Sequence, residues 1–71
     1  MFEIGYGRGY SAYYIAVYDD DATRDRSKYL HSDGVIRDST LNGESGYFTG
    51  YYYTRAEADR ALIEYNSKRG N

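Results

Sequence analysis

The sequence predicts an α+β fold, in which a small antiparallel β-sheet of three or four strands carries one C-terminal α-helix on one face. Two segments, 12–18 and 46–54, alternate side chains with the period of a strand, and a glycine-containing turn divides a third β-prone segment, 28–39. A helical apolar stripe follows a capping signal over 55–68. The 71 residues are expected to form a single domain, 1–71.

The predicted strand 12–18 has one face with two aliphatic side chains, and we expect that face to contact the core. Its residues are Tyr13, Ile15 and Val17. The opposite face presents Tyr14 and Tyr18 to solvent or to a partner. A short strand at Phe2–Ile4 is a candidate neighbour, joined to this strand through a turn at Gly7–Gly9.

The segment after this strand is a polar loop. It holds three consecutive aspartates, Asp19, Asp20 and Asp21, and two arginines, Arg24 and Arg26. Carboxylates can bind a hard cation, but the loop lacks the alternating ligands, the central glycine and the closing glutamate of an EF-hand loop. We therefore expect a solvated connection, with no metal site, whose charges can steer a basic partner.

A β-hairpin is expected over 28–39, with its turn at Ser32–Gly34. A three-residue turn with the glycine in the left-handed conformation pairs Leu30 with Ile36 and places both toward the core. A two-residue turn would instead pair Leu30 with Arg37. We prefer the first register, because a slip of one residue moves side chains to the wrong face.

His31 is the only histidine, and its position beside the turn is typical of an exposed strand residue. General acid–base catalysis would require a partner, such as Asp33 or Asp38, and a pocket. Metal binding would require ligands that no second histidine or cysteine supplies. No catalytic, cofactor or metal site is predicted, and we expect the protein not to be an enzyme.

The strand predicted at 46–54 runs directly into the helix. Thr54 and Glu57 form a capping-box pattern, in which the threonine hydroxyl accepts from the Glu57 N–H and the carboxylate reaches back to the Thr54 N–H. The apolar stripe of the helix consists of Ala58, Ala61, Leu62 and Tyr65. The alternation allows either face of this strand to point outward. One face carries Tyr47, Tyr51 and Tyr53, and the other carries Phe48 and Tyr52.

Composition limits the function classes. The net charge of −2 argues against a strongly basic nucleic-acid binder and against a strongly acidic mimic of DNA. There is no cysteine, and no apolar run is long enough to span a membrane, so we expect a cytoplasmic protein without membrane contact. Tyrosine is the outlier, with 11 residues against two phenylalanines, and tyrosine-rich patches are typical of recognition surfaces.

The sheet face opposite the helix is therefore expected to be an aromatic interaction surface for a protein partner. Expected partner-binding residues are Tyr14, Tyr18, Tyr29, Tyr51, Tyr52, Tyr53, Asp19, Asp20, Asp21, Arg24, Arg26 and Arg37. One alternative is a single-stranded nucleic-acid module that adds Arg8 to the arginines of this surface, although the acidic balance counts against it. A second alternative is a dimerisation or structural module whose partner is another copy of the chain.

Three stretches, Lys28–Gly34, Gly46–Phe48 and Arg55–Ala61, resemble those of short phage and prophage accessory proteins. Among such proteins, the anti-CRISPR inhibitors are compact, cysteine-poor and non-enzymatic, and they act by covering a surface of a nuclease complex. The resemblance implies a phage-encoded inhibitor that blocks a host CRISPR-Cas or other defence nucleoprotein complex by protein–protein contact in the host cytoplasm. It implies no catalytic residues and no cofactor.

Overall fold

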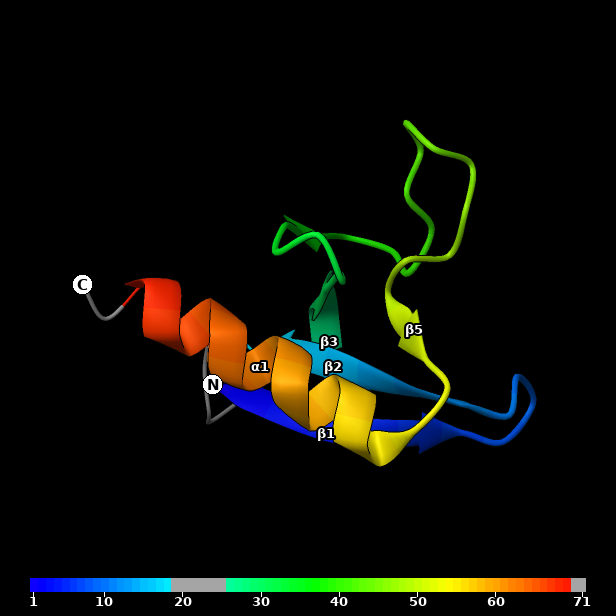
Figure 1. Ribbon diagram of the computed structural model, residues 1–71. Helices are drawn as coiled ribbons and strands as arrows, with labels where there is room; N and C mark the ends of the chain where they lie inside the picture. The colour runs from blue at the N-terminus through cyan, green and yellow to red at the C-terminus, as the bar shows by residue number, and fades with distance from the viewer. Residues whose placement is uncertain (19–25, 70–71) are drawn as a thin grey trace.

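The computed structural model describes residues 1–18 and 26–69, with the backbone alone at 26, 27 and 69. It shows the predicted α+β architecture, an antiparallel sheet with one C-terminal helix packed against it (Figure 1). The elements are β1 (Phe2–Gly7), β2 (Ala12–Tyr18), β3 (Arg26–Leu30), β4 (Ile36–Arg37), β5 (Tyr51–Tyr52) and α1 (Arg55–Arg69).

Strand β2 is the centre of the sheet. It pairs with the whole of β1, from Gly7 opposite Ala12 to Phe2 opposite Val17. Its other edge is divided: the C-terminal half pairs with β3, and the N-terminal half pairs with β5. The bounds of β2 are those predicted, whereas β1 extends three residues beyond the predicted Ile4.

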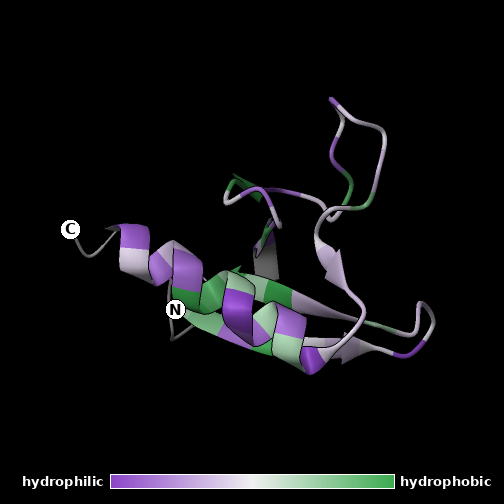
Figure 2. Ribbon diagram, viewed as in Figure 1, coloured by the Kyte–Doolittle hydropathy of each residue, from purple (hydrophilic) through white to green (hydrophobic). Residues whose placement is uncertain are grey.

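The core lies between the sheet and α1, which crosses β1 and β2 in Figure 1. Figure 2 shows hydrophobic residues on these two strands where the helix covers them. The buried members are Ile15, Leu30, Tyr52 and Ala58. Partly buried residues packed around them include Ile4, Tyr13, Val17, Ala61, Leu62 and Tyr65. The predicted core face of β2 and the predicted stripe of α1 are both confirmed.

The β3–β4 hairpin has the predicted register. Leu30 lies opposite Ile36, and Gly34 has a φ of 84°, the left-handed conformation that a three-residue turn requires. Arg37 of β4 donates two hydrogen bonds, at 3.1 and 2.9 Å, to the carboxylate of Asp33 in the turn. The second strand of the hairpin, β4, is short: it contains only two residues of the predicted segment 28–39.

The predicted strand 46–54 is wrong in extent, because only Tyr51–Tyr52 pairs with the sheet. The physical reason is the divided edge of β2, where β3 occupies the C-terminal half and β5 pairs with Tyr13 and Tyr14 in the other half. Upstream of β5, residues 38–50 form a long loop that projects from the sheet in Figure 1.

The N-terminus of α1 is capped nearly as predicted. The Glu57 N–H donates to Thr54 Oγ1 at 3.1 Å, which is the first half of the capping box. The second half differs, because Glu57 Oε2 accepts from the N–H of Tyr53, at 3.1 Å, and not from that of Thr54. The helix begins at Arg55 as predicted and ends one residue later than predicted.

Candidate binding cleft

Three aromatic rings meet on the sheet side that the helix leaves uncovered. Tyr10 comes from the β1–β2 turn, Tyr51 from β5 and Phe48 from the 38–50 loop. The rings of Tyr10 and Tyr51 are stacked, with centroids 5.1 Å apart, and Phe48 lies 5.9 Å from Tyr51. Tyr10 is 70% exposed and Phe48 57% exposed. We call these three residues the aromatic cluster.

The aromatic cluster separates two hollows, which together we call the aromatic cleft. The first hollow, of about 440 Å³, is lined mainly by Tyr10, Tyr47, Phe48, Tyr51 and Tyr53. The second hollow, of about 380 Å³, is lined by Gly7, the four tyrosines Tyr10, Tyr14, Tyr29 and Tyr51, and the polar run Asp38, Ser39 and Thr40. Tyr10 and Tyr51 line both hollows, so a ligand in either one contacts the same stacked pair.

A glycine on β1 makes room for one wall of the second hollow. Gly5 lies directly opposite Tyr14 in the sheet, and a Cβ atom at Gly5 would lie 2.4 Å from Cζ of the Tyr14 ring. The Tyr14 ring therefore lies across the glycine backbone, where any larger residue would displace it. The edge of the same ring meets the ring of Tyr29, with centroids 5.9 Å apart and planes at 81°.

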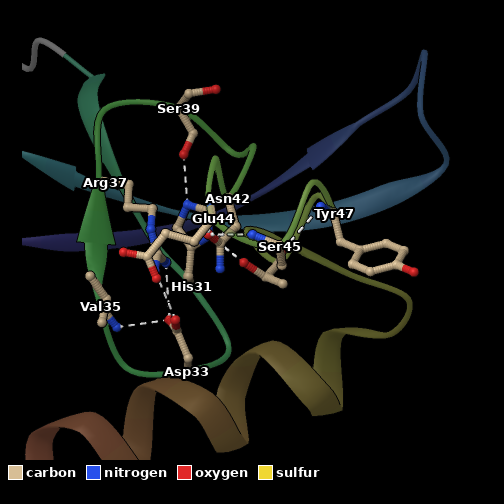
Figure 3. A network of polar contacts seen from close by, with 10 residues as sticks. His31, Asp33, Val35, Arg37, Ser39, Asn42, Glu44, Ser45 and Tyr47 are labelled. Atoms are coloured by element: carbon tan, nitrogen blue, oxygen red, sulfur yellow. Dashed lines mark hydrogen bonds and ion pairs between the residues drawn. The ribbon is translucent and has the colours of Figure 1, made fainter.

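A buried histidine holds the 38–50 loop against the sheet (Figure 3). His31 Nε2 lies 2.6 Å from the Ser39 carbonyl oxygen, and because a carbonyl can only accept, Nε2 carries a proton and donates. His31 Nδ1 lies 2.6 Å from the Thr49 hydroxyl. The prediction of an exposed His31 is wrong, because the residue is 1% exposed. Its two bonds hold both ends of the loop, which explains its burial.

The tip of the loop is shaped by Asn42, as Figure 3 shows. The side-chain oxygen of Asn42 accepts from the N–H groups of Glu44 and Ser45, and the backbone N–H of Asn42 donates to the Tyr47 carbonyl at 2.8 Å. This closed turn places Tyr47 and the adjoining Phe48 at the rim of the cleft. At the base of the loop, the Gly50 N–H donates to the Thr40 carbonyl.

The charges around the cleft are unevenly distributed. The hydrogen bonds from Arg37 are the main cause that lowers the pKa of the Asp33 carboxyl, and the same contact raises the pKa of Arg37. This pair is therefore internally neutralised. Asp38 is the single charged residue in the lining of the two hollows, as far as the described side chains go.

The structure brings together some of the predicted partner-binding residues. Tyr14, Tyr29 and Tyr51 are half-buried and line the second hollow, and Tyr53 is 86% exposed beside the first. The residues Asp19, Asp20, Asp21 and Arg24, and the side chain of Arg26, lie outside the described part of the chain. Arg37 is engaged by Asp33 and does not line the cleft.

Two predicted surface tyrosines are buried. Tyr52 is 6% exposed because it lies opposite Tyr13 on the core face, and its hydroxyl donates to the Leu30 carbonyl at 3.0 Å. Tyr18 is 5% exposed, and its hydroxyl donates to Glu3 Oε1 across β1. Both rings are therefore largely covered, although Tyr52 still contributes to the lining of the first hollow.

The expected partner-binding residues do not include three aromatic residues of the cleft, Tyr10, Tyr47 and Phe48, or its acid, Asp38. Tyr10 follows the Gly7–Gly9 turn, and Tyr47 and Phe48 follow Gly46, which has a φ of 79°. Aromatic residues placed directly after a glycine turn are the signal that could have indicated them, because such turns project side chains away from the sheet.

Comparison with protein-family models, with curated proteins and with solved structures finds no match for this chain. Within residues 1–18 and 26–69, no helix is long and apolar enough to cross a membrane. The same residues contain no group of three or more histidine, cysteine or acidic side chains that could hold a metal ion.

Proposed function

We propose that this chain is a non-enzymatic binding protein that engages a protein partner in the aromatic cleft. The observation that carries this proposal is the exposed aromatic cluster of Tyr10, Phe48 and Tyr51 between two hollows. Contiguous exposed aromatic surface on a small domain is typical of interaction sites. Tyrosine is favoured at such sites, because it buries a large rigid ring at low entropic cost and keeps a polar tip.

The way in which the cluster is built also supports recognition. Its rings come from the β1–β2 turn, from the 38–50 loop and from β5, so no single local pattern accounts for their meeting. Tyr51 lies on the sheet, and the His31 bonds hold the loop that carries Phe48. A preorganised aromatic surface binds with less loss of side-chain freedom than a mobile one.

The class of partner that we propose is a host defence nucleoprotein complex, which the protein would inhibit by covering one of its surfaces. The resemblance of Lys28–Gly34, Gly46–Phe48 and Arg55–Ala61 to phage accessory proteins of the anti-CRISPR type supports this choice. The activity would require no chemistry from the chain, only affinity and shape.

The test compares tagged wild-type protein with the double variant Tyr10→Ala/Phe48→Ala in capture from lysate of a bacterium with an active CRISPR-Cas system. Ile63→Ala is the matched control, because Ile63 is an exposed apolar residue of α1 that lies outside the cleft. We expect wild type and control to retain a nuclease complex after the nucleic acid in the lysate is digested, and the double variant to lose it. Equal retention by all three would refute the role of the cleft. Retention that vanishes on digestion would favour nucleic-acid binding instead.

A further inference from the structure

We propose that the second hollow is a cation pocket that takes an arginine side chain of the partner. This inference rests on the proposed function and specifies what its site recognises. The walls of the hollow are four tyrosines, Tyr10, Tyr14, Tyr29 and Tyr51, and its rim carries one carboxylate, Asp38. An aromatic box with a single acid is the chemistry that selects an organic cation.

The four tyrosine rings that line the hollow meet in two pairs. Tyr14 and Tyr29 meet nearly at right angles, at 81°, and Tyr10 stacks on Tyr51 with their planes 29° apart. The face of an aromatic ring carries negative charge density and attracts a cation. Tyrosines from the β1–β2 turn, β2, β3 and β5 thus all line the one hollow.

The charge at the rim selects the sign of the ligand. Asp38 makes no hydrogen bond and no ion pair with any other described residue, and it is exposed. The neighbouring carboxylate, that of Asp33, is already paired with Arg37. Among the side chains that the structure describes, no basic one lines either hollow. The Asp38 carboxylate would repel an anionic group such as phosphate, whereas a cationic side chain would gain an ion pair with it.

Arginine fits these features better than lysine. The planar guanidinium stacks on aromatic faces and can donate two parallel hydrogen bonds to one carboxylate, whereas an ammonium is a strongly hydrated point charge. The volume of about 380 Å³ is in the lower part of the range of small-ligand pockets, enough for a guanidinium and its aliphatic stem. Ser39 and Thr40 add polar groups at the rim for the remaining donors.

The probe is the capped peptide acetyl-Gly-Arg-Gly-amide, followed by chemical-shift titration of the isotope-labelled full chain. The control peptide carries citrulline in place of arginine, which keeps the shape and removes the charge. We expect the arginine peptide to shift resonances of Tyr14, Tyr29 and Tyr51, and the citrulline peptide to shift them much less. Equal binding of the two peptides, no binding of either, or shifts located elsewhere would overturn the proposal.

Two variants with the same change of charge test the role of the acid. Asp38→Asn should weaken binding of the arginine peptide by roughly five- to tenfold, since an ion pair to a guanidinium is lost. Glu44→Gln, in the same loop but outside both hollows, should leave the affinity within twofold of wild type, as expected for an exposed charge not in contact. An unchanged affinity of Asp38→Asn would remove Asp38 from the site and refute the pocket as described.

The outcomes also separate this inference from the proposed function. If the peptide fails to bind while Tyr10→Ala/Phe48→Ala still abolishes capture of the partner, the cation pocket is refuted and the proposed function stands. If the peptide binds as expected while the double variant captures the partner as wild type does, the hollow is a cation pocket, but the partner does not use the cleft and the proposed function is refuted.

Discussion

The substitution Tyr52→Phe tests how much the buried hydroxyl of Tyr52 contributes to the stability of the fold. The Tyr52 hydroxyl donates to the Leu30 carbonyl at 3.0 Å in the core. Phenylalanine keeps the ring and leaves that carbonyl without this donor. A lost hydrogen bond of this kind lowers the free energy of unfolding by about 1 to 2 kcal/mol near neutral pH.

The effect of this substitution should depend on pH in a defined direction. Burial is the larger cause that raises the pKa of Tyr52 to about 12, and the negative charge of Asp33 adds to it. The folded state therefore holds this proton more tightly than the unfolded state, in which the tyrosine has its ordinary pKa of 10.0. For this reason the contribution of the Tyr52 proton to the stability of the folded state is complete below pH 10. It is then lost between pH 10 and about 12, at about 1.4 kcal/mol per pH unit.

The two effects oppose each other. Wild type loses about 1.4 kcal/mol of this contribution by roughly pH 11, which is close to the cost of the missing hydrogen bond in Tyr52→Phe. The variant has no proton to lose at this position. We therefore expect wild type to be the more stable protein at pH 7, the two to become equal near pH 11, and the variant to be the more stable above it.

The assay is urea denaturation of both proteins at intervals from pH 7 to 11.5. All other titratable groups are common to both proteins, so the difference between the two reports position 52. Tyr53→Phe is the matched control, because it removes the hydroxyl of an adjacent tyrosine that is 86% exposed, and it should stay within about 0.5 kcal/mol of wild type throughout. A difference for Tyr52→Phe that stays constant with pH would refute the argument from burial.

Three further substitutions test the segments around the cleft. Gly50→Ala should lower the free energy of unfolding by roughly 1 to 3 kcal/mol, because its Cβ would lie 2.8 Å from the Thr40 Cα; an unchanged urea midpoint would contradict this. Thr49→Val keeps the shape but removes the hydroxyl beside His31, so we expect a loss of about 1 kcal/mol and faster amide hydrogen exchange in the loop than in wild type. Thr54→Ala should cost about 1 kcal/mol by thermal unfolding, with Thr54→Ser close to wild type.

The elements predicted correctly are those with strong local signals. The alternation of 12–18 gave the bounds of β2, the left-handed Gly34 gave the register of the hairpin, and the cap at Thr54 gave the start of α1. Each of these signals is contained within a few neighbouring residues. Such signals act in the same way whatever the rest of the chain does, and they can therefore be recognised from sequence.

The errors concern residues whose environment is set by distant parts of the chain. Segment 46–54 has strand-like alternation, but a strand also needs a free edge, and β3 occupies half of the edge it would use. An exposed His31 was expected from the sequence because the segments that bury it, around Ser39 and Thr49, are 8 and 18 residues away along the chain. Tyr18 is covered in the same non-local way, through its bond to Glu3 of β1.

Only part of the candidate cleft could be predicted, because some of its residues reach it from distant parts of the chain. Tyr14 and Tyr29 are adjacent in a sheet whose strand order follows from hairpins, so their meeting on one face could be foreseen. Tyr10 and Phe48 reach the cleft from a turn and from a long loop, and loop conformation is not encoded by periodicity. The hydropathy colouring of Figure 2 does not mark the cleft, because β5, which carries Tyr51, is coloured nearly white.

The register of β5, a strand of two residues, determines which tyrosine serves the fold and which serves the cleft. Tyr52 faces the core opposite Tyr13, whereas Tyr51, opposite Tyr14, belongs to the aromatic cluster. A shift of one residue would exchange them and would place a stacking ring in the core. Two cross-strand pairs are too few to fix this register alone. The close approach of Gly50 to Thr40, together with the His31 bonds that hold the loop, restrains it from outside the strand.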